Sequence, residues 1–144
     1  MGLITEFVVI APCDLPLLDT PELPPQALVR LSAKGVLSLN MALIEEALTG
    51  RDWDEAMEDY QERPVQGASR VAGPWIFQVS FSLMKALLKL EISNHHKVIA
   101  HLAQHEEFSG WGGVDGIFAF LRKLIDLAHE AESERKQIFA WVCL

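Results

Sequence analysis

Cysteine is scarce in this chain of 144 residues, which contains only Cys13 and Cys143. Two thiols provide neither a disulfide framework nor the spacing of a structural zinc motif. The sequence also lacks an apolar run close to the roughly 20 residues that a membrane-spanning helix needs. Residues 3–12 include Glu6 and have no basic flank, which is unlike a signal peptide. These absences predict a soluble, cytoplasmic protein with reduced thiols and no membrane segment.

Basic residues are few, because 12 Lys and Arg stand against 20 Asp and Glu and give a formal net charge of −8. Binding to a nucleic-acid backbone requires clusters of Lys and Arg that neutralise phosphates. We therefore expect no nucleic-acid partner and, if the partner is a macromolecule, a basic one. Hydrophobic residues make up 50% of the chain, which is ample for the core of a single domain over residues 1–144.

Catalytic and cofactor motifs are absent as well. The segment Gly67-Ala68-Ser69-Arg70 lacks the spacing of a nucleophile elbow and of a phosphate-binding loop, and Gly110–Gly113 lacks the dinucleotide-binding spacing. We therefore name no catalytic residue and expect no cofactor. The leading interpretation is a non-enzymatic binding protein.

What the chain does contain is a strand-like segment at each end. Residues 3–10 (LITEFVVI) and 137–144 (QIFAWVCL) are short and rich in β-branched and aromatic side chains. Nearly everything between them has the pattern of helix or loop. The pattern predicts an α+β single domain, with a small sheet formed by the terminal strands and packed by about six helices. Residues 75–79 (WIFQV) fit either a third strand or an extended lead to a helix that Ser80 caps.

Helical periodicity is strongest over residues 114–136, where apolar side chains recur at offsets 0, 3, 4, 7, 10, 11, 14 and 17. We expect Phe118, Leu121 and Ile125 to be core residues of this helix. Residues 66–74 hold two glycines and a proline and predict a flexible loop. Further helices are expected over residues 25–33, 39–48, 52–62, 81–90 and 94–106.

The helix expected over residues 52–62 is unusually acidic. Trp53, Met57 and Tyr60 form an apolar stripe that would anchor it, and most other positions are acidic. Like charges four residues apart on a helix repel by a few tenths of a kcal/mol. A solvated surface is the commoner interpretation of such a run, and a surface that binds a basic protein partner is the alternative that we favour. The residues assigned to this partner site are Asp54, Glu55, Glu58, Asp59 and Glu62.

His101 and His105 lie four residues apart on an expected helix, a spacing that can hold a metal ion. Lys97 lies four residues before His101 and opposes a second cation. Leu102 excludes the His-Glu-x-x-His motif. We therefore interpret the pair as surface histidines and expect no specific metal site.

Two other functions are open. A small hydrolase-like enzyme would have its site near Trp75, His95 and Trp111, and a homodimer could have a structural role. An enzyme needs a concave pocket with convergent polar groups, whereas a masking protein needs an exposed acidic or apolar patch.

The two ends and one internal motif resemble a known family. The pattern comprises Met1-Gly2-Leu3-Ile4 with Phe7 and Ile10, then Leu48-Thr49-Gly50, then the apolar face from Phe118 to Ala131 that leads into residues 138–142. It is similar to the YfbM-like family, the bacterial domain of unknown function numbered 1877. Members usually carry Trp and His before Leu-Thr-Gly, where this chain has Met41 and Glu45. The resemblance implies a compact α/β fold, a bacterial cytoplasmic setting and, by analogy with neighbours of secreted toxins, an immunity or antitoxin-like role.

Overall fold

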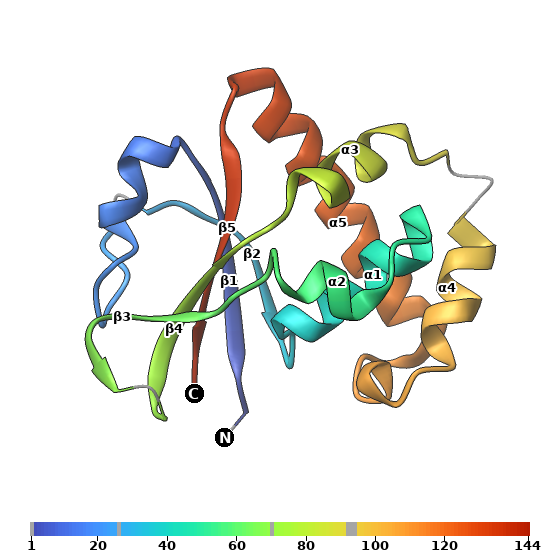
Figure 1. Cartoon of the computed structure of the whole chain (residues 1–144), viewed down its shortest axis with the longest axis horizontal. Coiled ribbons are helices and arrows are strands. Elements are labelled where there is room, and N and C mark those ends of the chain that lie inside the picture. Colours follow the sequence, from blue (N-terminus) through green and yellow to red (C-terminus); the bar gives the residue numbers. More distant parts are fainter. Residues whose placement is uncertain (1, 26, 70, 92–94) are drawn as a thin grey trace.

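The computed structural model describes residues 2–25, 27–69, 71–91 and 95–144, with only the backbone described for His95. An antiparallel sheet of five strands runs through this part of the chain. The strand order is β2-β1-β5-β4-β3. The strands are β1 (Ile4–Ile10), β2 (Val29–Lys34), β3 (Arg63–Ser69), β4 (Gly73–Gln78) and β5 (Gln137–Cys143). The helices are η1 (Pro12–Leu17), α1 (Ser38–Thr49), α2 (Trp53–Met57), α3 (Phe81–Lys89), α4 (His95–Ala103), η3 (Glu106–Phe108) and α5 (Gly113–Glu134). The predicted α+β class is confirmed (Figure 1).

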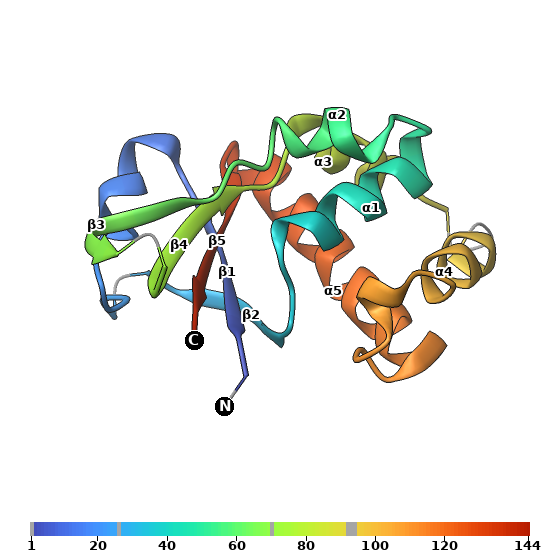
Figure 2. The same ribbon diagram turned by 60° about the horizontal axis from the view of Figure 1, so that its bottom comes forward.

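The two terminal segments pair directly with each other, as predicted. β1 and β5 are antiparallel neighbours, with Ile4 opposite Cys143 at one end and Ile10 opposite Gln137 at the other. The start of β1 and the end of β5 therefore lie side by side in both ribbon views (Figures 1 and 2). β1 and β5 are flanked by β2 and β4, so neither terminal strand is an edge of the sheet.

Side chains of β1 and β5 alternate between two apolar cores, because successive residues of a strand point to opposite faces. The larger core packs the sheet against α1, α3 and α5, and it includes Phe7, Val9, Ile138 and Ala140. The smaller core lies on the other face and holds Val8, Ile10, Phe139, Trp141, Leu18 and Val65. Figures 1 and 2 show the corresponding layers, with the helices on one side of the strands and η1 on the other. Burial on both faces explains why both terminal segments are almost continuously apolar.

The helix predicted over residues 25–33 is wrong, because Val29–Lys34 forms β2 and pairs with β1. Leu31 is buried and its neighbours Arg30 and Ser32 are exposed, which is strand alternation. Pro25 and Gly35 suggested the two ends of a helix. Gly35 has a φ of +68° and instead forms the turn after β2, and pairing with β1 decides the structure of this segment.

The flexible loop predicted over residues 66–74 is also wrong over most of its length. β3 extends to Ser69 and β4 begins at Gly73, and the two strands form an antiparallel pair. Of the two alternatives for residues 75–79, a third strand is confirmed through Gln78. Pro64 is tolerated because β3 is an edge strand, where a missing backbone donor is less costly.

Most predicted helices are confirmed, with shifted ends or faces. Ser80 caps α3, because its Oγ accepts a hydrogen bond from the Leu83 backbone N–H at 3.1 Å. In α5, Leu121 is buried as predicted, whereas Phe118 and Ile125 are partly buried and pack against the edge of the larger core. The core face of α5 is therefore rotated toward Phe120, Leu124 and Leu127. Among the described residues, no helix combines the length and apolar character required to cross a membrane.

The helix predicted over residues 94–106 is confirmed over His95–Ala103, which forms α4, and is wrong beyond Ala103, because a separate 3-10 helix, η3, begins at Glu106 and ends at Phe108. A turn at residues 104 and 105 separates them. Asn94 lies outside the described residues.

Candidate functional site

The acidic segment is less helical than predicted. α2 ends at Met57, so the helix expected over residues 52–62 is wrong beyond that residue. Residues 58–60 continue as turns, in which the Asp59 N–H donates to the Ala56 carbonyl at 2.9 Å and the Tyr60 N–H donates to the Met57 carbonyl at 3.1 Å. Tyr60 and Ala56 are buried and Met57 is partly buried, so these three residues anchor the segment.

Two of the five predicted partner-binding carboxylates, those of Asp59 and Glu62, bind residues outside α2 and the turns that follow it. Asp59 Oδ2 lies 2.6 Å from Arg51 Nη1, and this hydrogen bond is the main reason that the pKa of Arg51 is raised. Glu62 Oε1 accepts a hydrogen bond from the Ser38 backbone N–H, at the start of α1, at 3.1 Å. Asp59 and Glu62 therefore stabilise the fold locally.

The other three carboxylates, Asp54, Glu55 and Glu58, are exposed. Trp53 was expected to anchor the segment, but 45% of its surface is exposed. Its backbone N–H donates to Glu46 Oε2 at 3.0 Å, which fixes the start of α2. We call Trp53, Asp54, Glu55 and Glu58 the acidic patch. Within the described residues, its carboxylates form no ion pair with Lys or Arg.

Beneath the acidic patch lies a buried polar network around Glu45 on α1. Glu45 Oε1 accepts hydrogen bonds from the Tyr60 hydroxyl, at 3.0 Å, and from Ser80 Oγ. Glu45 Oε2 lies 3.0 Å from Arg51 Nη1. Burial raises the pKa of Tyr60 above its ordinary value. Ser80 also accepts from the Leu83 N–H, so its hydroxyl is committed to structural hydrogen bonds.

Sequence reasoning did not identify this network. The available signal was Glu45 itself, an acidic residue in a helix that is otherwise apolar around most of its circumference. A buried carboxylate requires hydrogen-bond partners. The sequence could not show that these come from Tyr60, Ser80 and Arg51.

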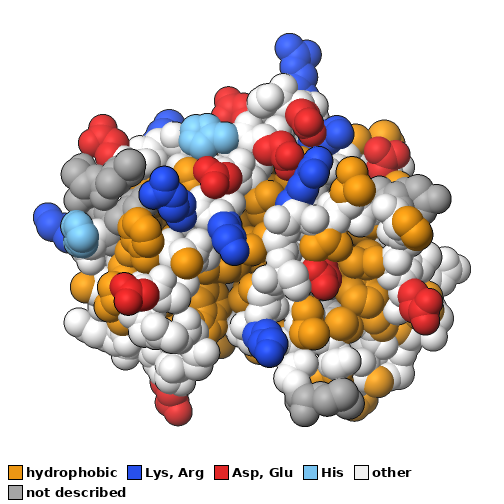
Figure 3. Space-filling view, turned by 180° about the vertical axis from the view of Figure 1, so that it is seen from behind, with side chains coloured by type: hydrophobic (Ala, Val, Ile, Leu, Met, Phe, Trp, Pro, Cys, Tyr) orange, Lys and Arg blue, Asp and Glu red, His pale blue; other side chains and the backbone are white. Residues whose placement is uncertain are grey.

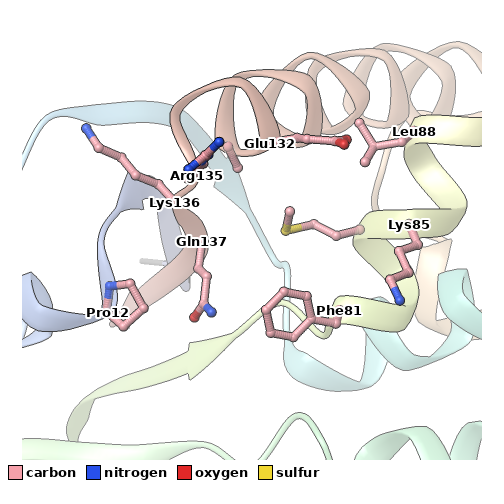
Figure 4. Close-up of a pocket in the computed structure, with 10 residues that line it drawn as sticks. Pro12, Phe81, Lys85, Leu88, Glu132, Arg135, Lys136 and Gln137 are labelled. Atoms are coloured by element: carbon pink, nitrogen blue, oxygen red, sulfur yellow. The ribbon is translucent and has the colours of Figure 1, made fainter.

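The largest of the described pockets, about 370 Å³, lies between α3 and the junction of α5 with β5 (Figure 4). Apolar side chains of Met84, Leu88 and Ala131 line it, and Phe81 stands at its side, 56% exposed. The polar lining residues do not converge. In Figure 4, Lys136 extends away from Phe81, and the Glu132 side chain points toward Leu88. The pocket can accept a small apolar group, but it lacks the convergent polar groups of a catalytic site.

The residues of the enzyme alternative are not brought together. β4, which carries Trp75, and α4, which begins at His95, lie on opposite sides of the molecule in both ribbon views (Figures 1 and 2). Trp111 packs its ring against Phe120, with centroids 4.8 Å apart. It also lines a pocket of about 220 Å³ with Lys34, to which neither β4 nor α4 contributes.

Charged side chains on the face opposite to the view of Figure 1 are mixed in sign. Figure 3 shows Lys and Arg interspersed with Asp and Glu there, with hydrophobic side chains between them. That face therefore presents no continuous positive surface of the kind that tracks a phosphate backbone.

His101 is exposed on α4, and His105 follows the helix and is partly buried. Their rings lie 5.2 Å apart between centroids, at an interplanar angle of 79°. Glu46, on α1, adds a carboxylate to this pair: one ligand atom from each of the three residues lies within 4.8 Å of the other two. Together these residues offer two imidazoles and a carboxylate to a metal ion.

Comparisons with family models, with curated proteins and with solved structures find no match. The similarity to the YfbM-like family remains a prediction from the terminal segments and Leu48-Thr49-Gly50. The geometry of the sites described above is therefore the basis for proposing a function.

Proposed function

We propose that this chain is a non-enzymatic protein of the bacterial cytoplasm that binds a basic protein partner through the acidic patch. The observation that carries the proposal is the exposed indole of Trp53 beside three exposed carboxylates. Tryptophan is enriched among residues that dominate binding energy at protein interfaces. Exposed carboxylates around it would steer an oppositely charged partner and suppress wrong ones.

The backbone that presents the acidic patch is well held. Tyr60 and Ala56 anchor it to the core, and Arg51 joins it to α1 through Glu45 and Asp59. A preorganised surface loses less conformational freedom on binding than a mobile one. The net charge of −8 adds a long-range attraction for a basic partner.

The family resemblance favours one form of this proposal, in which the protein masks a basic toxin and acts as an immunity or antitoxin-like protein. The enzyme alternative has weaker support, because Trp75 and His95 lie on elements at opposite sides of the molecule.

The test exchanges the charge of the acidic patch. A triple variant, Asp54→Lys, Glu55→Lys and Glu58→Lys, leaves Asp59 and Glu62 in place because both have structural partners. The matched control carries Asp14→Lys, Glu22→Lys and Asp126→Lys, three exposed positions outside α2 with the same change in net charge. Immobilised wild type and both variants are used to capture proteins from the native lysate, and the captured partner is then purified for rate measurements.

We expect wild type and the control variant to retain a basic protein that the patch variant loses. The association rate of the purified partner should fall steeply as salt is raised, because salt screens exposed charges. Trp53→Ala should mainly accelerate dissociation. Equal retention by both triple variants would show that the acidic patch is only a solvated surface.

A further inference from the structure

A group of metal-ligating side chains lies where α1 approaches α4, separate from the carboxylates of the acidic patch. Glu46 belongs to α1, His101 to α4 and His105 to the turn before η3. The positions of both histidines are held by backbone hydrogen bonds: the Gln104 N–H donates to the His101 carbonyl at 3.2 Å, and the His105 N–H donates to the Leu102 carbonyl at 3.0 Å. The turn between α4 and η3 therefore holds the two imidazoles side by side.

We propose that Glu46, His101 and His105 form a binding site for a divalent transition-metal ion of the zinc class. Imidazole and carboxylate ligands suit zinc, cobalt and nickel. Three protein ligands with a free fourth position are typical of an open zinc site. The sequence favoured surface histidines because Lys97 opposes a second cation and Leu102 excludes the His-Glu-x-x-His motif. The third ligand comes from α1, more than fifty residues earlier in the chain.

The ligand atoms of the three residues are near enough to one another to coordinate a single ion. Their separations are within 4.8 Å, and a tetrahedral site with bonds of 2.0–2.1 Å requires about 3.3 Å between ligand atoms. His101 is exposed and His105 is partly buried, so small rotations of these side chains supply the difference. The Glu46 carboxylate is already oriented, because its Oε2 accepts the Trp53 N–H at 3.0 Å.

A carboxylate that could orient a metal-binding histidine lies near His105. Such histidines commonly donate their second ring N–H to a carboxylate, which fixes the tautomer and the orientation of the ring. Glu107 Oε2 lies 4.0 Å from His105 Nδ1. This separation is longer than a hydrogen bond, so a small rotation of either side chain is needed before Glu107 can accept the Nδ1 proton and orient the ring.

The charges near the site also favour a cation. Lys97 is exposed one turn before His101, and its positive charge opposes a bound cation. Glu106 and Glu107, which follow His105, and the ligand Glu46 carry negative charges that attract one. Three carboxylates against one ammonium leave the neighbourhood negative when the histidines are neutral. Because the ligands come from separate elements, a bound ion would link α1 to the end of α4 and stabilise the fold.

The experiment titrates the full-length, untagged protein with zinc chloride in a calorimeter and with cobalt chloride in a spectrophotometer. Cobalt reports the coordination geometry through its visible absorption. We expect one equimolar site, a tetrahedral cobalt spectrum and an increase of several degrees in the melting temperature with zinc.

Single variants assign the ligands. Glu46→Gln keeps an acceptor for the Trp53 N–H and removes the anionic ligand, so it should retain the fold and weaken zinc binding at least tenfold. His101→Ala and His105→Ala should do the same, and Glu107→Gln should weaken binding less than any of these. His96→Ala and His129→Ala change exposed histidines outside the site and should leave affinity unchanged. A Cys13→Ser, Cys143→Ser variant should bind normally, which excludes a thiol site.

Several results would overturn the proposal. They are the absence of saturable zinc binding, zinc binding that Glu46→Gln leaves unchanged, and binding that disappears when both cysteines are replaced. The metal titrations require no protein partner, so their outcome is independent of the acidic-patch experiment.

Discussion

Different kinds of structure cover the two faces of the sheet. One face packs on α1, α3 and α5, and the other lies under η1. The larger core is formed by helices whose buried side chains interlock over a wide area. The smaller core is covered by η1 and the segment that follows it, from which Leu18 and Ala27 are buried. The cover over the smaller core has little regular structure, and polar contacts to the sheet supplement its apolar packing.

Those polar contacts are specific. Asp19 Oδ1 accepts from Arg63 Nη1 at 3.2 Å and from the Gln66 backbone N–H at 2.7 Å, both on β3. The Trp141 indole N–H donates to the Thr20 carbonyl at 3.2 Å. Helices cover one face, whereas apolar contacts of irregular segments together with individual hydrogen bonds cover the other. β1 and β5 are common to both cores, so a change in either strand should affect the whole domain.

The largest effect should therefore come from β5. Deleting Phe139–Leu144 removes the central partner of both β1 and β4 and strips side chains from both cores at once. We expect no soluble protein from this truncation, measured as yield after expression. Deletion of Leu144 alone, an exposed residue beyond the strand, is the control and should give wild-type yield. A normal yield of the longer truncation would contradict the central place of β5.

Matched substitutions of buried leucine compare the two cores directly. Leu121→Ala, on α5 in the larger core, should cost about 2–5 kcal/mol of unfolding free energy, because surrounding helices cannot collapse into the cavity. Leu18→Ala, in the smaller core, should fall near the lower limit of about 2 kcal/mol, because the segment that carries it can relax. Denaturant unfolding of both variants measures the difference. Equal losses would mean that the irregular cover is as rigid as the helices.

Local patterns predicted only part of this architecture. The terminal strands and α5 were predictable because their apolar patterns are long and mutually consistent. β2 was mistaken for a helix because Pro25 and Gly35 are placed like helix ends, and only its pairing with β1 makes this segment a strand. β3 was missed because Pro64 and Gly67 resemble loop residues, although an edge strand tolerates both.

The candidate sites were harder to predict, because they depend on contacts between distant segments. Acidic composition identified the region of the patch, but it could not show that Arg51 engages Asp59 or that Glu62 binds the start of α1. The approach of Glu46 to His101 and His105 likewise follows from the packing of α1 near α4. Periodicity describes one element at a time, and such sites lie between elements.

The smallest effect at neutral pH concerns the buried polar network around Glu45, which lies beside the larger core. Tyr60 is the only tyrosine in the chain, so tyrosinate absorbance reports this residue alone. Burial raises its pKa above 10.0 in the folded protein, whereas the unfolded chain ionises near that value. The contribution of the protonated Tyr60 hydroxyl to the free energy of unfolding is thus fully present below about pH 10. It is lost as the pH rises further, because Tyr60 then releases its proton in the unfolded state and keeps it in the folded state. We expect no tyrosinate signal at pH 10 until the protein unfolds. We also expect the unfolding free energy to fall above that pH, and to fall less in Tyr60→Phe than in the wild type.

The pKa of Cys143 is also raised and acts on the unfolding free energy in the same direction, so the difference between wild type and Tyr60→Phe is the informative quantity. Tyr60→Phe should itself cost about 1.5 kcal/mol at neutral pH, because it removes a hydrogen bond to the buried carboxylate of Glu45 as well as the contact with Ser80. Ionisation of Tyr60 near pH 10 in the native protein would show that water reaches the network, and the larger core would then be less tightly closed than its packing indicates.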